Sequence, residues 1–123
     1  MIFDHIALTA SDYEKSRRFF VNALQPLGIE LAMEFEGSAG FGKDGKPELW
    51  LSGGKDAQRP MHIAFVAATR AQVAAFYAAA IAAGGKDNGP PGVRANYHPN
   101  YFGAFVIGPD GHNVEAVCHK PEA

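Results

Sequence analysis

The sequence predicts an α+β fold built from two copies of one βαβββ module, and two observations support this prediction. The first is an internal repeat, in which residues 4–8 (Asp-His-Ile-Ala-Leu) return at residues 61–65 (Met-His-Ile-Ala-Phe), 57 positions later. The second is the order of elements in each half, where a strand is followed by a helix and then by short β-like runs. We expect a single domain, with module one at about residues 1–53 and module two at about residues 61–119.

The first half opens with a strand at about residues 2–9 and continues with a helix. Ser11 and Glu14 match a capping box, which predicts Ser11 as the N-cap of that helix. Apolar residues at helical spacing carry the helix to about Leu27, and Gly28 ends it. Residues 29–51 are typical of short strands around a hairpin turn at residues 43–46, and the polar stretch 52–60 is expected to link the halves.

The second half repeats this order, with a strand at residues 62–67 and an alanine-rich helix that starts near Thr69 and stops at Gly84 and Gly85. We predict a loop at residues 87–92 (Asp-Asn-Gly-Pro-Pro-Gly), because glycine and proline interrupt regular structure. A polar and aromatic segment at residues 94–101 precedes a closing hairpin, with strands at 102–107 and 113–118 around a turn at 108–111.

Composition excludes several classes of function. The net charge of −2 offers no electrostatic basis for binding nucleic acid or an anionic membrane. The single cysteine, Cys118, rules out an internal disulfide and fits a reducing cytosol. The sequence shows neither a charged-then-apolar leader nor an apolar run near 18 residues, so we expect a cytoplasmic protein without a membrane span.

Strand alternation predicts that the two repeated histidines and the bulky residues next to them point to opposite faces of their strands. Small side chains such as Ala7 and Ala64 share the faces of His5 and His62, whereas the neighbouring large apolar side chains point the other way. We therefore expect a helix to cover the bulky face of each strand, and the histidine face to stay open for a ligand.

The doubled module, a histidine at the head of each half and a closing turn followed by a strand glutamate resemble the vicinal oxygen chelate superfamily. It includes glyoxalase I, extradiol dioxygenases, fosfomycin resistance enzymes and metal-free bleomycin resistance proteins. The resemblance covers essentially the whole chain and implies one cup-shaped, mostly antiparallel sheet with the helices outside. It also implies homodimers, with the site formed within one chain or across two. The motifs that carry it are Asp4-His5-Ile6, Met61-His62-Ile63-Ala64 and Pro109-Asp110-Gly111-x-x-x-Glu115.

The resemblance implies metal ligands at His5, His62 and Glu115. Two imidazoles and one carboxylate are a ligand set that leaves open positions for water and substrate, and it suits iron(II), manganese, zinc or nickel. The strand around Glu115 is apolar on both faces, where an unpaired carboxylate is costly. Glu115 is therefore a candidate catalytic residue as well as a ligand.

Glu48 is a further candidate, because glyoxalase I enzymes use a fourth ligand from the equivalent strand of the first half. Glu115 follows Asp110 by five positions, but Glu48 follows Asp44 by four. If the two hairpins share a register, Leu49 takes the ligand position and Glu48 points outward, because a one-residue shift reverses the face. A bulge near Pro47 would restore Glu48 to the ligand face.

The segment at residues 94–101 is expected to border the cavity and to contact a small-molecule substrate. Arg94 suits a carboxylate or phosphate, His98 suits acid–base work, and Tyr97 and Tyr101 suit hydrogen bonding or stacking. An alternative is a loop held together by its own aromatic side chains. We expect His112 and His119 at the surface.

Three functions are compatible with these residues. The first is a metal-dependent glyoxalase-like lyase or isomerase, in which the metal acts as a Lewis acid. The second is an iron(II) extradiol-type dioxygenase, with His98 as acid–base residue. The third is a metal-free protein of the bleomycin resistance type that binds a drug or metabolite. The sequence names no substrate.

Overall fold

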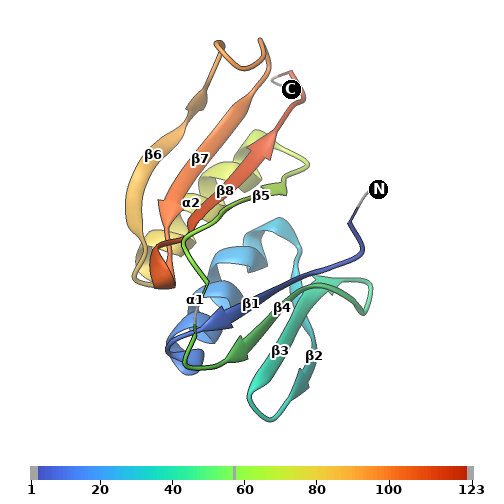
Figure 1. Cartoon of the computed structure of the whole chain (residues 1–123). Helices are drawn as coiled ribbons and strands as arrows, with labels where there is room; N and C mark the ends of the chain where they lie inside the picture. Colours follow the sequence, from blue (N-terminus) through green and yellow to red (C-terminus); the bar gives the residue numbers. More distant parts are fainter. Residues whose placement is uncertain (1–2, 57, 122–123) are drawn as a thin grey trace.

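The computed structural model describes residues 3–56 and 58–121, and it contains the predicted module twice (Figure 1). In the described residues each half has one α-helix, one short 3₁₀ turn (Gln25–Leu27 or Pro109–Gly111) and four strands. The first half comprises β1 (Ile6–Ala10), α1 (Tyr13–Leu24), β2 (Glu30–Phe35), β3 (Ser38–Lys43) and β4 (Lys46–Gly53). The second comprises β5 (His62–Val66), α2 (Arg70–Ala82), β6 (Lys86–Val93), β7 (Phe102–Ile107) and β8 (Asn113–Cys118).

The strands form two four-stranded sheets with matching topology. Their orders are β1-β4-β3-β2 and β5-β8-β7-β6. In each sheet the first strand pairs parallel with the last, and the two remaining pairings are antiparallel. The predicted α+β fold with tandem βαβββ modules and mostly antiparallel pairing is therefore confirmed, but the single cup-shaped sheet expected from the resemblance is two separate sheets in this chain, because no strand of one half pairs with a strand of the other among the described residues.

Each sheet has one covered and one uncovered face. The bulky residues of the histidine strands lie on the covered side, where Leu8 and Ile63 join the hydrophobic core, while Ala7 and Ala64 are exposed. Phe19, Phe20, Val73 and Phe76 from the helices complete this core, and α1 and α2 also pack against each other. Figure 1 shows the first sheet below and the second above, as separate units. Within one chain the two sheets therefore present two open faces.

The helices begin at polar caps, one of which differs from the prediction. Thr69 caps α2 by accepting a hydrogen bond from the Gln72 N–H. The predicted N-cap of α1, Ser11, is wrong: Asp12 has the extended backbone of a cap and accepts from the Lys15 N–H. The Ser11 hydroxyl instead donates to the carboxylate of Asp110 at 2.5 Å. A contact with the second half therefore moves the cap by one residue.

The end of α1 also differs slightly from the prediction. The α-helix stops at Leu24, and a 3₁₀ turn (Gln25–Leu27) follows, with Gly28 in a left-handed conformation. None of the described helices is both long and apolar enough to span a membrane.

The predicted loop at residues 87–92 is wrong, because this stretch belongs to β6. β6 is an edge strand that pairs only with β7. An edge strand tolerates proline, which has no N–H, because no ladder hydrogen bond is needed there. Its pairing with β7 shifts register on both sides of Gly89. Tertiary pairing thus keeps a Gly- and Pro-rich stretch extended.

Candidate functional site

The uncovered face of the second sheet brings His62 and Glu115 together. In the parallel pairing of β5 with β8, His62 lies opposite Asn113 and Ala64 lies opposite Glu115. The His62 Nε2 atom lies 2.6 Å from Glu115 Oε1. The Glu115 side chain is 1% exposed and the His62 side chain 55% exposed, so the imidazole forms the outer part of the pair.

Tyr101 holds the other oxygen of this buried carboxylate. Its hydroxyl donates to Glu115 Oε2, so both carboxylate oxygens have partners. Burial, reinforced by the hydrogen bond to Glu115, raises the pKa of Tyr101 to about 12. The phenol therefore stays protonated at neutral pH and remains a donor. The cost of burying Glu115 is reduced by these two contacts.

Aromatic and basic side chains border this pair. The ring of Phe105 lies 6.1 Å from that of His62, and the Arg94 guanidinium lies 5.4 Å from the Phe105 ring centre. Arg94 also donates to the Pro90 carbonyl at 2.8 Å, which orients the guanidinium. Tyr97 contacts the Tyr101 ring edge-on at 5.1 Å. Of the three residues predicted for substrate binding, Tyr101 contacts the pair directly, whereas Arg94 contacts Phe105 and Tyr97 contacts Tyr101.

Two more histidines lie at the margin of this group. His98, the predicted acid–base residue, is exposed, and its Nδ1 accepts from the Asn100 N–H at 3.0 Å. Its ring lies 5.8 Å from that of His119, which lies 5.1 Å from the Tyr101 ring. His119 is exposed, as predicted, and its alternation with Glu115 along the chain was the signal that could have added it to the group.

His112 was predicted at the surface, and that prediction is wrong. The residue is 2% exposed, and its Nδ1 accepts the Met61 N–H at 2.9 Å. Burial lowers the pKa of His112. The imidazole thereby joins the turn before β8 to the start of β5, which is a structural role.

His5, the third predicted metal ligand, lies on the other half of the chain. Its side chain is 54% exposed, and its Nδ1 lies 2.7 Å from the Asp4 carboxylate. Asp4 also lies 3.3 Å from the Lys46 ammonium, and the contacts with His5 and then Lys46 lower the pKa of Asp4. Among residues 3–56 and 58–121, no three His, Cys, Asp or Glu side chains lie together as a metal site would require. One chain therefore brings together two of the three predicted ligands.

The register of the first sheet places Trp50 where the second sheet has Glu115. Ala7 pairs with Trp50 in the way that Ala64 pairs with Glu115. The equivalent position is therefore occupied by Trp50 and not by Leu49, which is buried on the covered face. The Trp50 ring is stacked on Phe35 at 6.2 Å and 14°. This aromatic pair was not identified from the sequence.

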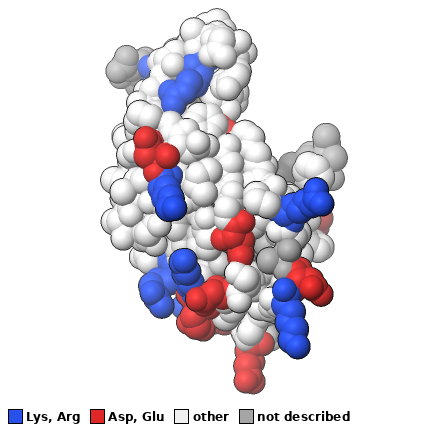
Figure 2. Space-filling view, turned by 60° about the vertical axis from the view of Figure 1, so that its left-hand side comes forward, with Lys and Arg blue, Asp and Glu red and all other residues white. Residues whose placement is uncertain are grey.

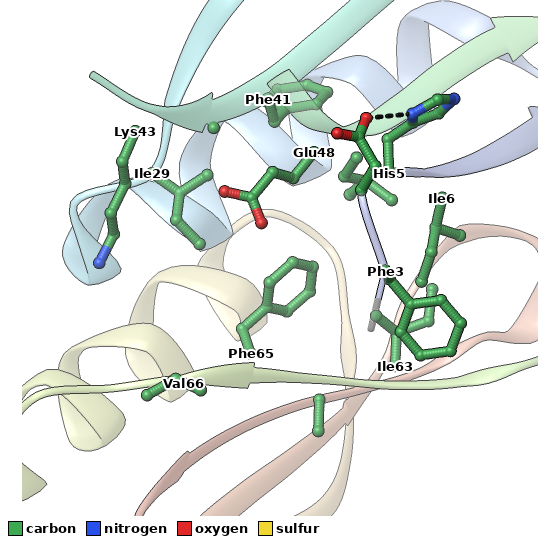
Figure 3. Close-up of a pocket in the computed structure, with 14 residues that line it drawn as sticks. Phe3, His5, Ile6, Ile29, Phe41, Lys43, Glu48, Ile63, Phe65 and Val66 are labelled. Carbon is green, nitrogen blue, oxygen red and sulfur yellow. Dashed lines mark hydrogen bonds and ion pairs between the residues drawn. The ribbon is translucent and has the colours of Figure 1, made fainter. Parts of the chain in front are cut away.

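Glu48 sits in a β-bulge. The β3–β4 pairing shifts between Phe41, opposite Leu49, and Gly42, opposite Pro47, so Glu48 is the extra residue. Figure 3 shows its carboxylate pointing toward Ile29 and Phe65, whereas the His5 ring points away. The bulge considered from the sequence is present. It directs the Glu48 side chain toward a cavity of about 320 Å³ that lies between the halves.

Charge is dispersed on the face shown in Figure 2. Acidic and basic side chains are interspersed there, around broad uncharged areas. Such a distribution lacks the single-sign patch that attracts a polyanion.

Comparisons with known proteins identify the family. The family model for the Glyoxalase/Bleomycin resistance protein/Dioxygenase superfamily matches residues 2–116. A glyoxalase/bleomycin resistance protein from Albidiferax ferrireducens has a similar crystal structure, with a TM-score of 0.83 and 25% identity over 98% of this chain and 100% of that one. A search of curated proteins found no match.

Two further solved structures share the fold at lower identity. A glyoxalase-related enzyme from Fulvimarina pelagi has a TM-score of 0.71 and 22% identity, over 96% of this chain and 87% of that one. The oxidase ChaP-H2 has a TM-score of 0.68 and 21% identity, over 100% and 96% of the two chains. Together with the doubled module, the family match shows that this chain belongs to the Glyoxalase/Bleomycin resistance protein/Dioxygenase superfamily.

Proposed function

We propose that this protein is a divalent-metal enzyme of the glyoxalase type, acting on a small molecule that binds metal through neighbouring oxygens. The observation that carries this proposal is the buried Glu115 carboxylate paired with His62 on an uncovered sheet face. A fully buried carboxylate is rare unless it has a specific partner or function. The proposal is supported by Tyr101, which contacts Glu115, and by Arg94, which lies over the Phe105 ring next to His62.

The ligand atoms of His62 and Glu115 are of the types that bind divalent metals. An imidazole nitrogen and a carboxylate oxygen are ligands for iron, manganese, zinc and nickel, and both belong to adjacent strands of one rigid sheet. Tyr101 orients the carboxylate from behind, as outer-shell hydrogen bonds do in metal sites. His5 would be the third ligand, but the His5 of the same chain does not lie together with His62 and Glu115 among the described residues.

We propose that a second copy of the chain supplies it, in a homodimer whose two sites each combine the first sheet of one subunit with the second sheet of the other. The open faces carry exposed large apolar side chains, with Phe35 60% and Val66 74% exposed. In the described part of the chain, β1 and β5 each have one unpaired edge. Apolar faces and free edges of this kind favour association. The partner subunit's His5 would then complete the ligand set.

Each neighbouring residue has a role in this proposal. A bound divalent metal would act as a Lewis acid toward a substrate oxygen. Arg94 would bind a substrate carboxylate or phosphate, because its planar guanidinium suits these groups. His98 would accept or return a proton, and Tyr97 would contact the substrate through its exposed ring. Tyr101 keeps Glu115 oriented, and its high pKa keeps it a hydrogen-bond donor.

An iron(II) dioxygenase is the second candidate, and Trp50 is the observation that favours it. A tryptophan at the position equivalent to Glu115 leaves two histidines and one carboxylate as the ligand set. That set is the facial triad of non-haem iron(II) oxygenases. The structural likeness to the oxidase ChaP-H2 is compatible with this chemistry.

The metal content of untagged protein tests both candidates. We expect about one equivalent of divalent metal per chain by plasma mass spectrometry, lost by at least tenfold in His62→Ala and Glu115→Ala. His119→Ala is the matched control, because it removes an exposed histidine outside the proposed ligand set. Iron would direct assays to ring cleavage, and zinc or nickel to isomerase chemistry. Failure to take up any of the four metals would contradict the proposal and favour a metal-free binding protein.

Mixing two inactive variants tests the shared site. His5→Ala and His62→Ala should each fail to bind metal as pure proteins. If each site uses two chains, subunit exchange in an equal mixture restores about one quarter of the sites, since half of the dimers contain one intact ligand set. If each site forms within one chain, the mixture restores none.

A further inference from the structure

A cavity lies between the two halves, and its lining includes His5, Ala64 and Val66 but neither His62 nor Glu115. Six of the apolar side chains that line it come from the two halves together: Ile6, Ile29, Phe41, Leu49, Ile63 and Phe65. Its volume of about 320 Å³ lies at the lower end of the range for small-molecule sites. All of these walls belong to one chain, so the cavity requires neither a metal nor a second subunit.

Glu48 places a carboxylate at this cavity. The bulge puts Glu48 on the same side of β4 as Leu49, because the extra residue interrupts the alternation of faces. Figure 3 shows its carboxylate directed toward Ile29 and Phe65. Within the described part of the chain, no hydrogen bond or ion pair is formed by this carboxylate.

The other charged groups at the cavity are arranged differently. Asp4 is already shared by His5 and Lys46. Lys43 lies at the rim beyond Ile29, and its ammonium points away from the Glu48 carboxylate in Figure 3. Glu48 is therefore the charged group that faces the apolar walls without a partner in the described residues.

We propose that this cavity binds a small organic amine, with the apolar part of the ligand among the six side chains and its ammonium group at Glu48. An ammonium would pair with the free carboxylate, and the rings of Phe41 and Phe65 would favour a nearby cation. A carboxylic acid of the same size would bring like charge to Glu48. The ligand class follows from one carboxylate at the edge of an apolar cavity.

The test compares three probes of similar shape but different charge: 2-phenylethylamine, 2-phenylethanol and 3-phenylpropanoic acid. Binding to the full chain is followed by NMR chemical shifts of Ile63 and Phe65. We expect the amine to bind two- to fivefold more tightly than the alcohol, about the preference that one exposed ion pair supplies. This preference should disappear in Glu48→Gln and remain in Glu36→Gln, a matched change of an exposed glutamate at the β2–β3 turn.

Several outcomes would overturn the proposal. Equal affinity for amine and alcohol, no saturable binding of any probe, or an unchanged preference in Glu48→Gln would each do so. Preferential binding of the acid, lost in Lys43→Met, would assign the cavity to anions instead. Amine binding should also survive His62→Ala, so the outcome here is independent of the metal measurements. Its loss in that variant would place the amine on the sheet face and contradict the proposed site.

Discussion

Trp50 and Glu115 occupy equivalent positions in the two halves of the chain. Each lies on the last strand of its sheet, opposite an alanine of the parallel histidine strand: Ala7 for Trp50 and Ala64 for Glu115. The two repeated modules therefore have the same backbone arrangement but different side chains on their open sheet faces. The second is built around a buried carboxylate, and the first around an aromatic stack of Trp50 and Phe35.

Glu115→Gln should separate metal binding from stability. The neutral amide keeps the shape of the side chain and removes a buried charge, so the free energy of unfolding should fall by no more than about 1 kcal/mol. Metal affinity should fall at least tenfold, because a carboxylate ligand is lost. Urea unfolding and metal titration of the same samples measure both effects. A large loss of stability without loss of metal would identify Glu115 as a structural residue.

Tyr101→Phe should destabilise the protein, because it leaves one oxygen of the buried Glu115 without a donor. The expected decrease in the free energy of unfolding is about 1–3 kcal/mol. Tyr97→Phe is the control, since the Tyr97 side chain is 63% exposed and forms no hydrogen bond with Glu115. Urea denaturation of both variants provides the comparison. Equal stabilities would show that the Tyr101 hydroxyl does not support the carboxylate.

His112 should make stability depend on pH in a defined direction. Its pKa is lowered by burial from the usual 6.5, so the unfolded chain takes up a proton that the folded chain resists. The free energy of unfolding should therefore be highest above pH 6.5, and should fall as the pH drops below that value. Protonation would also remove the acceptor of the Met61 N–H.

Urea unfolding between about pH 8 and pH 5.5 measures this dependence, in a range that lies above the titration of ordinary carboxylates. The decrease should be smaller in His112→Gln than in the parent protein. His119→Gln, at an exposed position, should keep the parent profile. An unaltered pH profile in His112→Gln would show that another group controls the effect.

Gly42→Ala should disrupt the β3–β4 bulge. A Cβ atom at this position would lie 1.7 Å from the Lys46 carbonyl oxygen, so the backbone of the hairpin must move. We expect a loss of at least about 2 kcal/mol in the free energy of unfolding, typical of severe steric clashes. Lys43→Ala, at the exposed neighbouring position, should change it by less than about 0.5 kcal/mol. Thermal and urea unfolding provide the measurement, and wild-type stability of Gly42→Ala would contradict this account of the bulge.

Much of the fold could be predicted from local patterns. The turn at residues 43–46 was identified because Asp44 and Gly45 suit a hairpin, and both have positive φ angles in the structure (53° and 76°). The 57-residue repeat predicted two equivalent modules, and alternation correctly separated Leu8 and Ile63 from the open faces. These features depend on neighbouring residues in the chain.

Other features could not be predicted, because distant contacts decide them. The N-cap lies at Asp12 since Ser11 bonds with Asp110 of the other half. The Gly- and Pro-rich residues of β6 are extended because β7 pairs with them. The environment of Glu115 also depends on Tyr101, which is 14 positions away in sequence and belongs to the segment before β7.

The doubled α+β module and the faces of the strands that follow or contain the repeated histidines could be predicted from the sequence, because side-chain periodicity and turn chemistry are local properties. Tertiary structure alone decided which of the candidate site residues meet. It paired His62 with Glu115, left His5 in the other half just before β1, placed Trp50 opposite Ala7 and directed the Glu48 side chain toward the cavity. Strand register and bulges control these relationships, and a shift of one residue reverses the face that a side chain occupies.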